Sequence, residues 1–318
     1  MLKLRRLLMI GILSFALVSA CRGNSARQVS SQAVRVVEHA MGQTKVPVDP
    51  QRVVVLAGGL DTVLSLGVKP VGSVQIDRED NYLKNKAEKV ESVGSPRNPN
   101  LEAIVALEPD LILGSKFDDP EKYKLLSQIA PTVIAEVDSS GEWKEMLNKY
   151  AEALGETDRA EQIMADYNAR IDEFQAQMGD RLEQTEVSIV RVSQDRINIY
   201  LEDSFCGTIV ADAGLPRPPN QTNTEDSFSM DISKELLNMA DANVIFIWTA
   251  GSGNSEKAER EAQGNLEQLK ADPLWSKLNA VQQGKVYDSP RYWVGMGPIS
   301  ANLVLDDLFE YLVSSNNK

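Results

Sequence analysis

Basic and aromatic side chains gather where the predicted strands of this sequence end. Arg191 lies inside a predicted strand over residues 186–192, where an arginine either points into a polar cleft or pairs at a strand edge. Seven other residues follow apolar runs: Arg97, Lys116, Phe117, Trp248, Arg291, Tyr292 and Trp293. Ligands of open α/β sheets lie at the carboxyl ends of the strands, and cations beside aromatic rings suit a flat ligand rich in oxygen or negative charge. These eight residues are therefore the predicted ligand site.

The sequence offers little for catalysis or for a directly ligated metal. His39 is the one histidine, and it lies in an N-terminal strand region, which disfavours mechanisms that need a catalytic histidine. A zinc, manganese or copper site would draw on several histidines or thiolates, and the chain has only two cysteines, Cys21 and Cys206. Gly58-Gly59 after a strand could receive an anion, but a tight turn is the favoured interpretation. Cys206 is predicted to be a small, buried, apolar residue.

One sequence pattern occurs twice and indicates two similar lobes. Residues 101–115 read LEAIVALEPDLILGS and residues 234–249 read KELLNMADANVIFIWT. In each, a glutamate, Glu102 or Glu235, opens a short amphipathic helix, and a polar residue eight positions later starts an apolar strand. A helix followed by a buried strand is one α/β unit. Two lobes of this kind predict a ligand cleft between them.

The remaining elements complete an α/β reading in two halves. An N-terminal lobe is predicted over residues 45–140, a connecting helical segment over 141–180 and a C-terminal lobe over 181–318. Apolar residues at helical spacing predict a helix over 157–178 with Thr157 as its N-cap. This helix would be about 33 Å long, and we expect it to be a rigid connector rather than an ordinary packing helix of one lobe.

The N-terminus predicts secretion and a lipid anchor. Residues 1–20 combine three basic residues with an apolar stretch, which is typical of a signal peptide. Val18-Ser19-Ala20-Cys21 resembles the bacterial lipobox, whose cysteine is diacylated, so Cys21 is the predicted lipidation site, with residues 21–44 as a tether. The formal net charge is −13, and removal of three basic and no acidic residues leaves −16. This charge argues against nucleic acid as a partner.

Several segments together resemble one protein family. They are the lipobox, the strand RVVVL with its Gly-Gly, NLEAIVALEPDLILGS, the long central helix, DSFCGTIVADAGLPRP and VGMGPISANLVLDDLFEYL. The chain resembles the bacterial ABC-transporter substrate-binding lipoproteins for iron–siderophore complexes, which are related to the cobalamin and haem binders. The resemblance covers essentially the whole mature chain. It implies two Rossmann-like lobes joined by one long rigid helix, with the ligand in the cleft between them.

The resemblance also implies partners and roles. The cargo would be a ferric siderophore, which supplies the oxygen ligands of Fe(III) itself, so the protein needs no cofactor and no metal ligands. Glu102 and Glu235 would dock onto arginines of the permease dimer, which works with an ATPase. The protein would be a non-enzymatic monomer, lipid-anchored outside the cytoplasm, on the periplasmic side if the cell has two membranes.

Two alternatives remain open on the residues alone. A haem or corrinoid receptor would use an axial ligand such as Tyr292 or Met296, and an enzyme on nitrogenase-like lobes would need cysteine clusters that this chain lacks. The siderophore could be of hydroxamate, catecholate or citrate type. A strongly anionic catecholate would favour several pocket cations, whereas a less charged ligand would rely on one arginine with aromatic rings.

Overall fold

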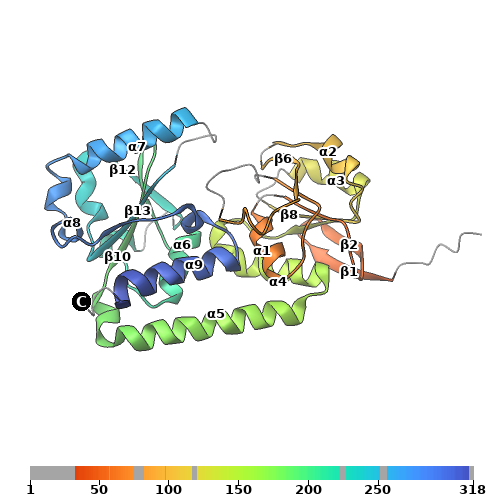
Figure 1. The fold of residues 1–318 in the computed structure, drawn as a ribbon, viewed down its shortest axis with the longest axis horizontal. Helices are drawn as coiled ribbons and strands as arrows, with labels where there is room; N and C mark the ends of the chain where they lie inside the picture. Colours follow the sequence, from red (N-terminus) through yellow and green to blue (C-terminus); the bar gives the residue numbers. More distant parts are fainter. Residues whose placement is uncertain are drawn as a thin grey trace, which may run out of the picture. The chain divides into compact units, whose positions relative to one another are not determined.

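The computed structural model describes residues 33–56, 58–74, 82–96, 98–116, 120–222, 227–250 and 256–314, and these contain two five-stranded sheets (Figure 1). The sheet of the N-terminal lobe is parallel throughout, in the order β5-β4-β3-β8-β9. Its strands are β3 (Val53–Val55), β4 (Gly72–Ser73), β5 (Glu91–Ser92), β8 (Leu111–Ser115) and β9 (Thr132–Ala135). A short β6–β7 pair (Gly94–Ser95 and Asn98–Pro99) lies outside this sheet. The parallel α/β order agrees with the prediction for this half.

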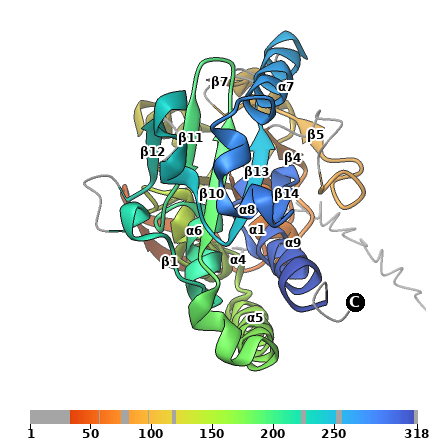
Figure 2. The ribbon, with the colours of Figure 1, turned by 90° about the vertical axis from the view of Figure 1, so that its left-hand side faces the viewer.

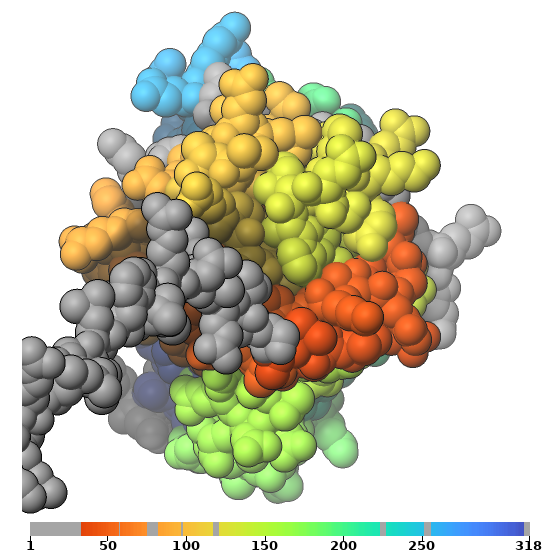
Figure 3. Space-filling model, turned by 90° about the vertical axis from the view of Figure 1, so that its right-hand side faces the viewer, coloured from red at the N-terminus to blue at the C-terminus, as the bar shows by residue number. Residues whose placement is uncertain are grey.

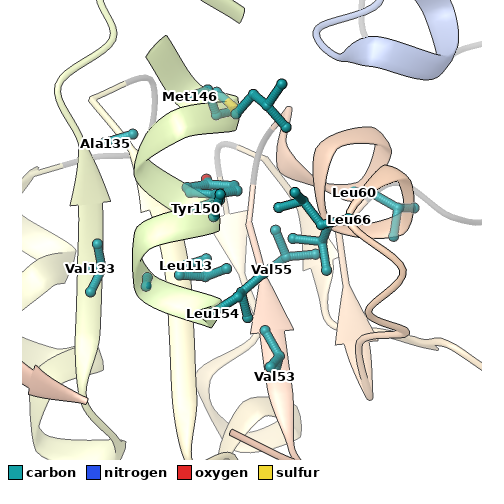
Figure 4. Packing of buried hydrophobic residues seen from close by; sticks show 14 of the residues in the cluster. Val53, Val55, Leu60, Leu66, Leu113, Val133, Ala135, Met146, Tyr150 and Leu154 are labelled. Atoms are coloured by element: carbon teal, nitrogen blue, oxygen red, sulfur yellow. The ribbon is translucent and has the colours of Figure 1, made fainter. Parts of the chain in front are cut away.

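Alternating side chains of the parallel strands build two cores in this lobe. Val53 and Val55 pack with α1 (Gly59–Ser65) and α4 (Trp143–Leu154), as Figure 4 shows. Val54 points to the opposite face, which α2 (Leu101–Ala106) and α3 (Tyr123–Ile129) cover. The two-residue period of a strand therefore explains why a fully apolar run is buried on both sides.

The sheet of the C-terminal lobe mixes parallel and antiparallel strands. Its order is β12-β11-β10-β13-β14, in which β10, β13 and β14 are parallel and the β10–β11–β12 edge is antiparallel (Figure 2). The strands are β10 (Val187–Val192), β11 (Ile197–Tyr200), β12 (Ser229–Ile232), β13 (Val244–Thr249) and β14 (Val286–Asp288). Helices α6 (Phe205–Asp212) and α9 (Pro298–Leu308) cover one face, and α7 (Glu256–Lys270) covers the other. Helix α8 (Asn279–Gln282) precedes β14.

The repeated polar residue has the same structural role in both lobes. The carboxylate of Asp110 accepts the backbone N–H groups of Gln51 and Arg52, at 2.7 and 2.9 Å, just before β3. The side-chain oxygen of Asn243 accepts the N–H of Glu186 at 2.7 Å, just before β10. Each side chain thus accepts backbone N–H groups just before the strand that pairs with the strand it opens. This explains why a polar residue opens both apolar runs.

Helix α5 (Thr157–Met178) joins the two cores. Ala160 and Ile163 pack in the core of the N-terminal lobe, whereas Tyr167, Ile171 and Phe174 pack in that of the C-terminal lobe. The predicted helix range is confirmed, but its N-cap is Glu156 instead of Thr157. The predicted connector over 141–180 was too wide, because most buried residues of α4 belong to the N-terminal core.

The predicted tether over residues 21–44 overlaps a folded hairpin. Strands β1 (Val34–His39) and β2 (Gly42–Pro47) pair antiparallel, and Val37 and Val46 are fully buried in the N-terminal core. Figure 3 shows this hairpin in red on the surface of the lobe. The signal peptide and Cys21 lie outside the described residues. None of the described helices is long and apolar enough to cross a membrane.

His39 is a structural residue of this hairpin. Its Nδ1 accepts the N–H of Met41 at 3.2 Å, and its Nε2 lies 2.8 Å from the Thr44 hydroxyl. Burial, with a contribution from the charge of Lys149, lowers the pKa of His39 below its usual 6.5. The folded protein therefore favours the neutral imidazole.

Acidification should weaken the fold through His39. Because the pKa of His39 is lowered by folding, the unfolded chain binds the proton more readily than the folded protein does. The contribution of neutral His39 to stability is therefore present above the ordinary histidine pKa and is lost as the pH falls through the folded pKa. We expect the free energy of unfolding to fall between about pH 7 and 5, and to fall less in His39→Gln. Urea unfolding at several pH values measures this, and identical pH slopes for both proteins would contradict it.

Candidate functional site

A polar pocket of about 530 Å³ lies on the antiparallel edge of the C-terminal sheet. Its principal lining residues are Arg191 from β10, Asn198 and Tyr200 from β11, and Phe228 and Asp231 near or in β12. Arg191 pairs with Asn198 in the strand register, so side chains at alternate positions of both strands share one face. The pocket therefore follows from the sheet register and contains one of the predicted site residues.

Arg191 has poorly satisfied hydrogen bonds. Its Nη1 lies 3.3 Å from the Tyr200 hydroxyl and its Nη2 lies 3.5 Å from the carbonyl oxygen of Ala250. Both are longer than ordinary N–H···O bonds. Its Nε is buried and has no hydrogen-bond partner among the described residues. A partly buried guanidinium with spare donors suits a carboxylate or another oxygen anion, which can accept two of its hydrogen bonds at once.

Aromatic rings form the wall behind this guanidinium. The ring of Tyr200 lies 4.9 Å from that of Trp248 and 5.6 Å from that of Phe228, measured between centroids. Burial raises the pKa of Tyr200, and the charge of Arg191 opposes this shift. Trp248 is only 4% exposed. It therefore supports Tyr200 from behind instead of facing a ligand directly.

The sequence prediction missed Tyr200, Phe228 and Asn198. None of them lies after the carboxyl end of a parallel strand, the position that indicates a ligand residue in an open α/β sheet. The pairing of Arg191 with Asn198 across an antiparallel hairpin brings them to the site. Tyr200 lies two positions beyond Asn198, the strand partner of Arg191, so it can be predicted as a pocket residue only when the register of the hairpin is known.

Lys116 lies directly after β8, at the carboxyl edge of the N-terminal sheet, where the sequence placed it. Its ammonium group makes salt bridges of 3.1 Å with Glu136 and 3.2 Å with Asp138, which follow β9. Hydrogen bonds to these two carboxylates raise the pKa of Lys116. Lys116 thus remains charged but is locally neutralised.

The aromatic pair after β14 has a different role from the predicted one. Trp293 is fully buried, stacks on Phe246 at 4.3 Å and donates its indole N–H to Asp307 at 2.6 Å. Its placement on the ligand rim was wrong, because its apolar ring fills the core of the C-terminal lobe. Tyr292 donates its hydroxyl to Asp307 at 3.0 Å, and burial together with this carboxylate raises the pKa of Tyr292.

Of the three remaining predicted site residues, the structure describes only one. Arg291 forms a salt bridge with Glu259 of α7, so its charge is compensated. Arg97 and Phe117 lie outside the described residues, and their roles stay predictions. Among the described residues, no group of three or more His, Cys, Asp or Glu side chains could hold a metal ion.

The two glutamates of the repeated pattern are both exposed. Glu102 lies in the first turn of α2, whose predicted N-cap Asn100 is confirmed by its bond to the N–H of Ala103 at 3.1 Å. Glu235 opens η5 (Lys234–Ala240), which is a kinked 3₁₀ segment instead of the predicted amphipathic helix. Hydrogen bonding from Ser233 lowers the pKa of Glu235, so it stays ionised.

Comparison with known proteins identifies the family. The model of the periplasmic binding protein family matches residues 53–292. The chain is 36% identical to the "Probable siderophore-binding lipoprotein YfiY" of Bacillus subtilis over 97% of this chain and 98% of that protein. It is 31% identical to the "Achromobactin-binding periplasmic protein" of Dickeya dadantii, covering 81% of this chain and 85% of that one.

A solved structure agrees with the two-lobed fold. Staphylococcus aureus SirA complexed with staphyloferrin B matches with a TM-score of 0.79 and 30% identity, over 87% of this chain and 98% of that chain. The match over nearly the whole of both chains confirms the predicted fold class, and a binding-protein family agrees with the prediction of a non-enzymatic protein. The chain belongs to the periplasmic binding protein family.

Proposed function

We propose that this protein captures a ferric siderophore outside the cytoplasm and delivers it to an ABC importer. The observation that carries the proposal is the Arg191 pocket, with under-used donors against an aromatic wall, in a chain whose full-length relatives include a probable siderophore-binding lipoprotein. A flat chelate rich in oxygen fits such a surface. The siderophore supplies the iron ligands, so no resident metal or cofactor is needed.

The haem and corrinoid alternative has weaker support. The Tyr292 hydroxyl is engaged by Asp307, and His39 is bound within the N-terminal hairpin. Met296 packs against the N-terminal core, and its sulfur lies where a side chain on Gly58 would be. Each candidate axial ligand is thus held in a structural contact, whereas a haem iron needs one that is free to coordinate.

The transporter partner would bind the two exposed glutamates, Glu102 and Glu235. Glu102 lies near the exposed Val105, which is 53% exposed, and Glu235 precedes Leu236, which is 48% exposed. Exposed carboxylates beside apolar side chains suit a protein partner that offers arginines and a small apolar surface. A permease dimer with its ATPase is the proposed partner, and the protein is proposed to act as a monomer anchored through lipid on Cys21.

A fluorescence titration tests the ligand class. Trp248 packs on Tyr200 in the wall of the pocket, so ferric siderophores should quench its emission on binding. Haem and cobalamin serve as controls. Saturable quenching by at least one ferric siderophore and by neither control is the expected result, and saturation by haem or cobalamin alone would refute the proposal.

A further inference from the structure

We propose that the ligand is a ferric siderophore of carboxylate type, less negatively charged than a tricatecholate complex, which presents one of its carboxylate groups to Arg191. This inference rests on the proposed function and narrows its ligand class. It excludes the strongly anionic tricatecholate complexes as the preferred cargo. The cations of the site differ in whether they already have an acidic partner.

Three of the four described cations considered for the site are paired with carboxylates. Lys116 lies between Glu136 and Asp138. Arg196 pairs with Asp195 and Asp231, and Arg291 pairs with Glu259. A ligand that recruited these cations would have to displace or share carboxylates already beside them, so they offer little net attraction to a highly charged anion.

Arg191 differs from those three cations. No described carboxylate lies within salt-bridge distance of its guanidinium, although the side chain is partly buried on β10, the strand between β11 and β13. Its two hydrogen bonds, at 3.3 and 3.5 Å, go to neutral oxygens, and its Nε lacks a partner. One carboxylate can satisfy such a fork with two parallel bonds. The geometry therefore provides for a single anionic group.

Acidic side chains further limit the charge that the pocket tolerates. Asp195 and Asp231 line it together with Arg191 and Arg196, so its described lining contains as many carboxylates as cations. The mature chain as a whole is strongly acidic, at −16 once residues 1–20, with three basic residues, are removed from a chain of −13. A highly anionic complex would meet unfavourable electrostatics both on approach and in the pocket.

The rest of the wall suits the uncharged part of a chelate. Tyr200 and Phe228 line the pocket with rings 5.6 Å apart, and Asn198 adds an amide. Aromatic faces favour apolar or delocalised groups and do not select for negative charge. One arginine with aromatic rings thus matches a ligand that places one carboxylate group on Arg191 and packs less polar parts against the rings.

The test compares three iron complexes on the full-length protein in detergent. The probes are ferric staphyloferrin B for the carboxylate type, ferrichrome for the uncharged hydroxamate type and ferric enterobactin for the tricatecholate type. Tryptophan quenching gives the Kd of each. We expect ferric staphyloferrin B to bind at least about tenfold more tightly than ferric enterobactin, a difference of about 1.4 kcal/mol.

Variants assign the preference to Arg191. Arg191→Gln should weaken binding of ferric staphyloferrin B by about tenfold to a hundredfold, because it removes charge-assisted bonds, and Arg191→Lys should weaken it less. Arg260→Gln is the matched control, since Arg260 is exposed on α7 and pairs only with Glu256 among the described carboxylates. The thermal melting temperature of each variant confirms that it is folded.

The outcomes separate this inference from the proposed function. Tightest binding of ferric enterobactin or ferrichrome would overturn the carboxylate class while leaving a siderophore receptor in place. An unchanged Kd for ferric staphyloferrin B in folded Arg191→Gln would also overturn it. Saturation by haem or cobalamin, with none of the three iron complexes bound, would refute the proposed function itself.

Discussion

Replacing Glu102 and Glu235 together by lysine is expected to abolish iron uptake while leaving the affinity for the siderophore unchanged. Both side chains are exposed at the start of a helical turn, one in each lobe. Neither lines the Arg191 pocket. Charge reversal would place like charges against the arginines of the proposed permease, which costs several kcal/mol at an interface.

Two measurements together test this docking role. Uptake of radioactive iron is followed in cells whose own copy is replaced by the variant, and Kd is measured on the isolated protein. We expect uptake to fall by at least about a hundredfold. A control with the same charge change is Glu145→Lys with Glu183→Lys, because both glutamates are exposed elsewhere in the chain. It should keep most of its uptake.

Each unexpected result has a definite meaning. A parallel loss of affinity would assign Glu102 and Glu235 to the ligand site. Normal uptake by the double variant, with expression equal to that of the wild type, would exclude docking through these carboxylates. The single variants should each lose part of the uptake, because each lobe is proposed to contact one half of the permease dimer.

Much of the fold could be predicted because its signals are local. The apolar runs around Val54 and Ile112 are buried on both faces, which gives a parallel sheet without any knowledge of partners. The helical spacing from Ala160 to Met178 gives α5 to the residue. Residues 34–44 of the hairpin were assigned to the tether despite their strand-like pattern, since the alternation is short and half of the hairpin residues are exposed.

The site was less accessible to such reasoning because it depends on pairing between distant residues. Arg191 was recognised as unusual within a strand, but its aromatic neighbours come from an antiparallel register that composition does not determine. Lys116 was found, whereas its pairing with Glu136 and Asp138 requires β8 and β9 to be neighbours. Trp293 follows a strand as a rim residue would, and only the packing of Phe246 shows it to be core.

The contact between α1 and α9 could not be predicted from local sequence patterns either. The carboxylate of Asp61 accepts the backbone N–H groups of Ile299 and Ser300, at 2.8 and 2.9 Å, in the first turn of α9. It also accepts the hydroxyl of Tyr82 at 2.9 Å. Leu60 and Val63 of α1 belong to the N-terminal core, whereas most of the buried residues of α9 belong to the C-terminal core. Asp61 therefore makes a further connection between the lobes besides α5.

Asp61→Ala is accordingly expected to destabilise the protein strongly. It would leave two backbone donors at the start of α9 and the Tyr82 hydroxyl without their acceptor, and Asp61 itself is only 2% exposed. Unsatisfied buried donors of this kind cost about 1–3 kcal/mol each, so we expect a loss of about 3–5 kcal/mol and a lower melting temperature.

Thermal and urea unfolding measure this effect against two matched variants. Asp61→Asn keeps one acceptor oxygen and should lose about half as much stability, because it can still satisfy part of the turn. Asp172→Ala removes an exposed carboxylate from α5 and should stay within about 0.5 kcal/mol of the wild type. If Asp61→Ala behaved like Asp172→Ala, the turn of α9 would be satisfied by water, and the Asp61 connection between the lobes would contribute little stability. A loss confined to Asp61→Ala and Asp61→Asn would instead show that this buried carboxylate stabilises the junction at which α1 meets α9.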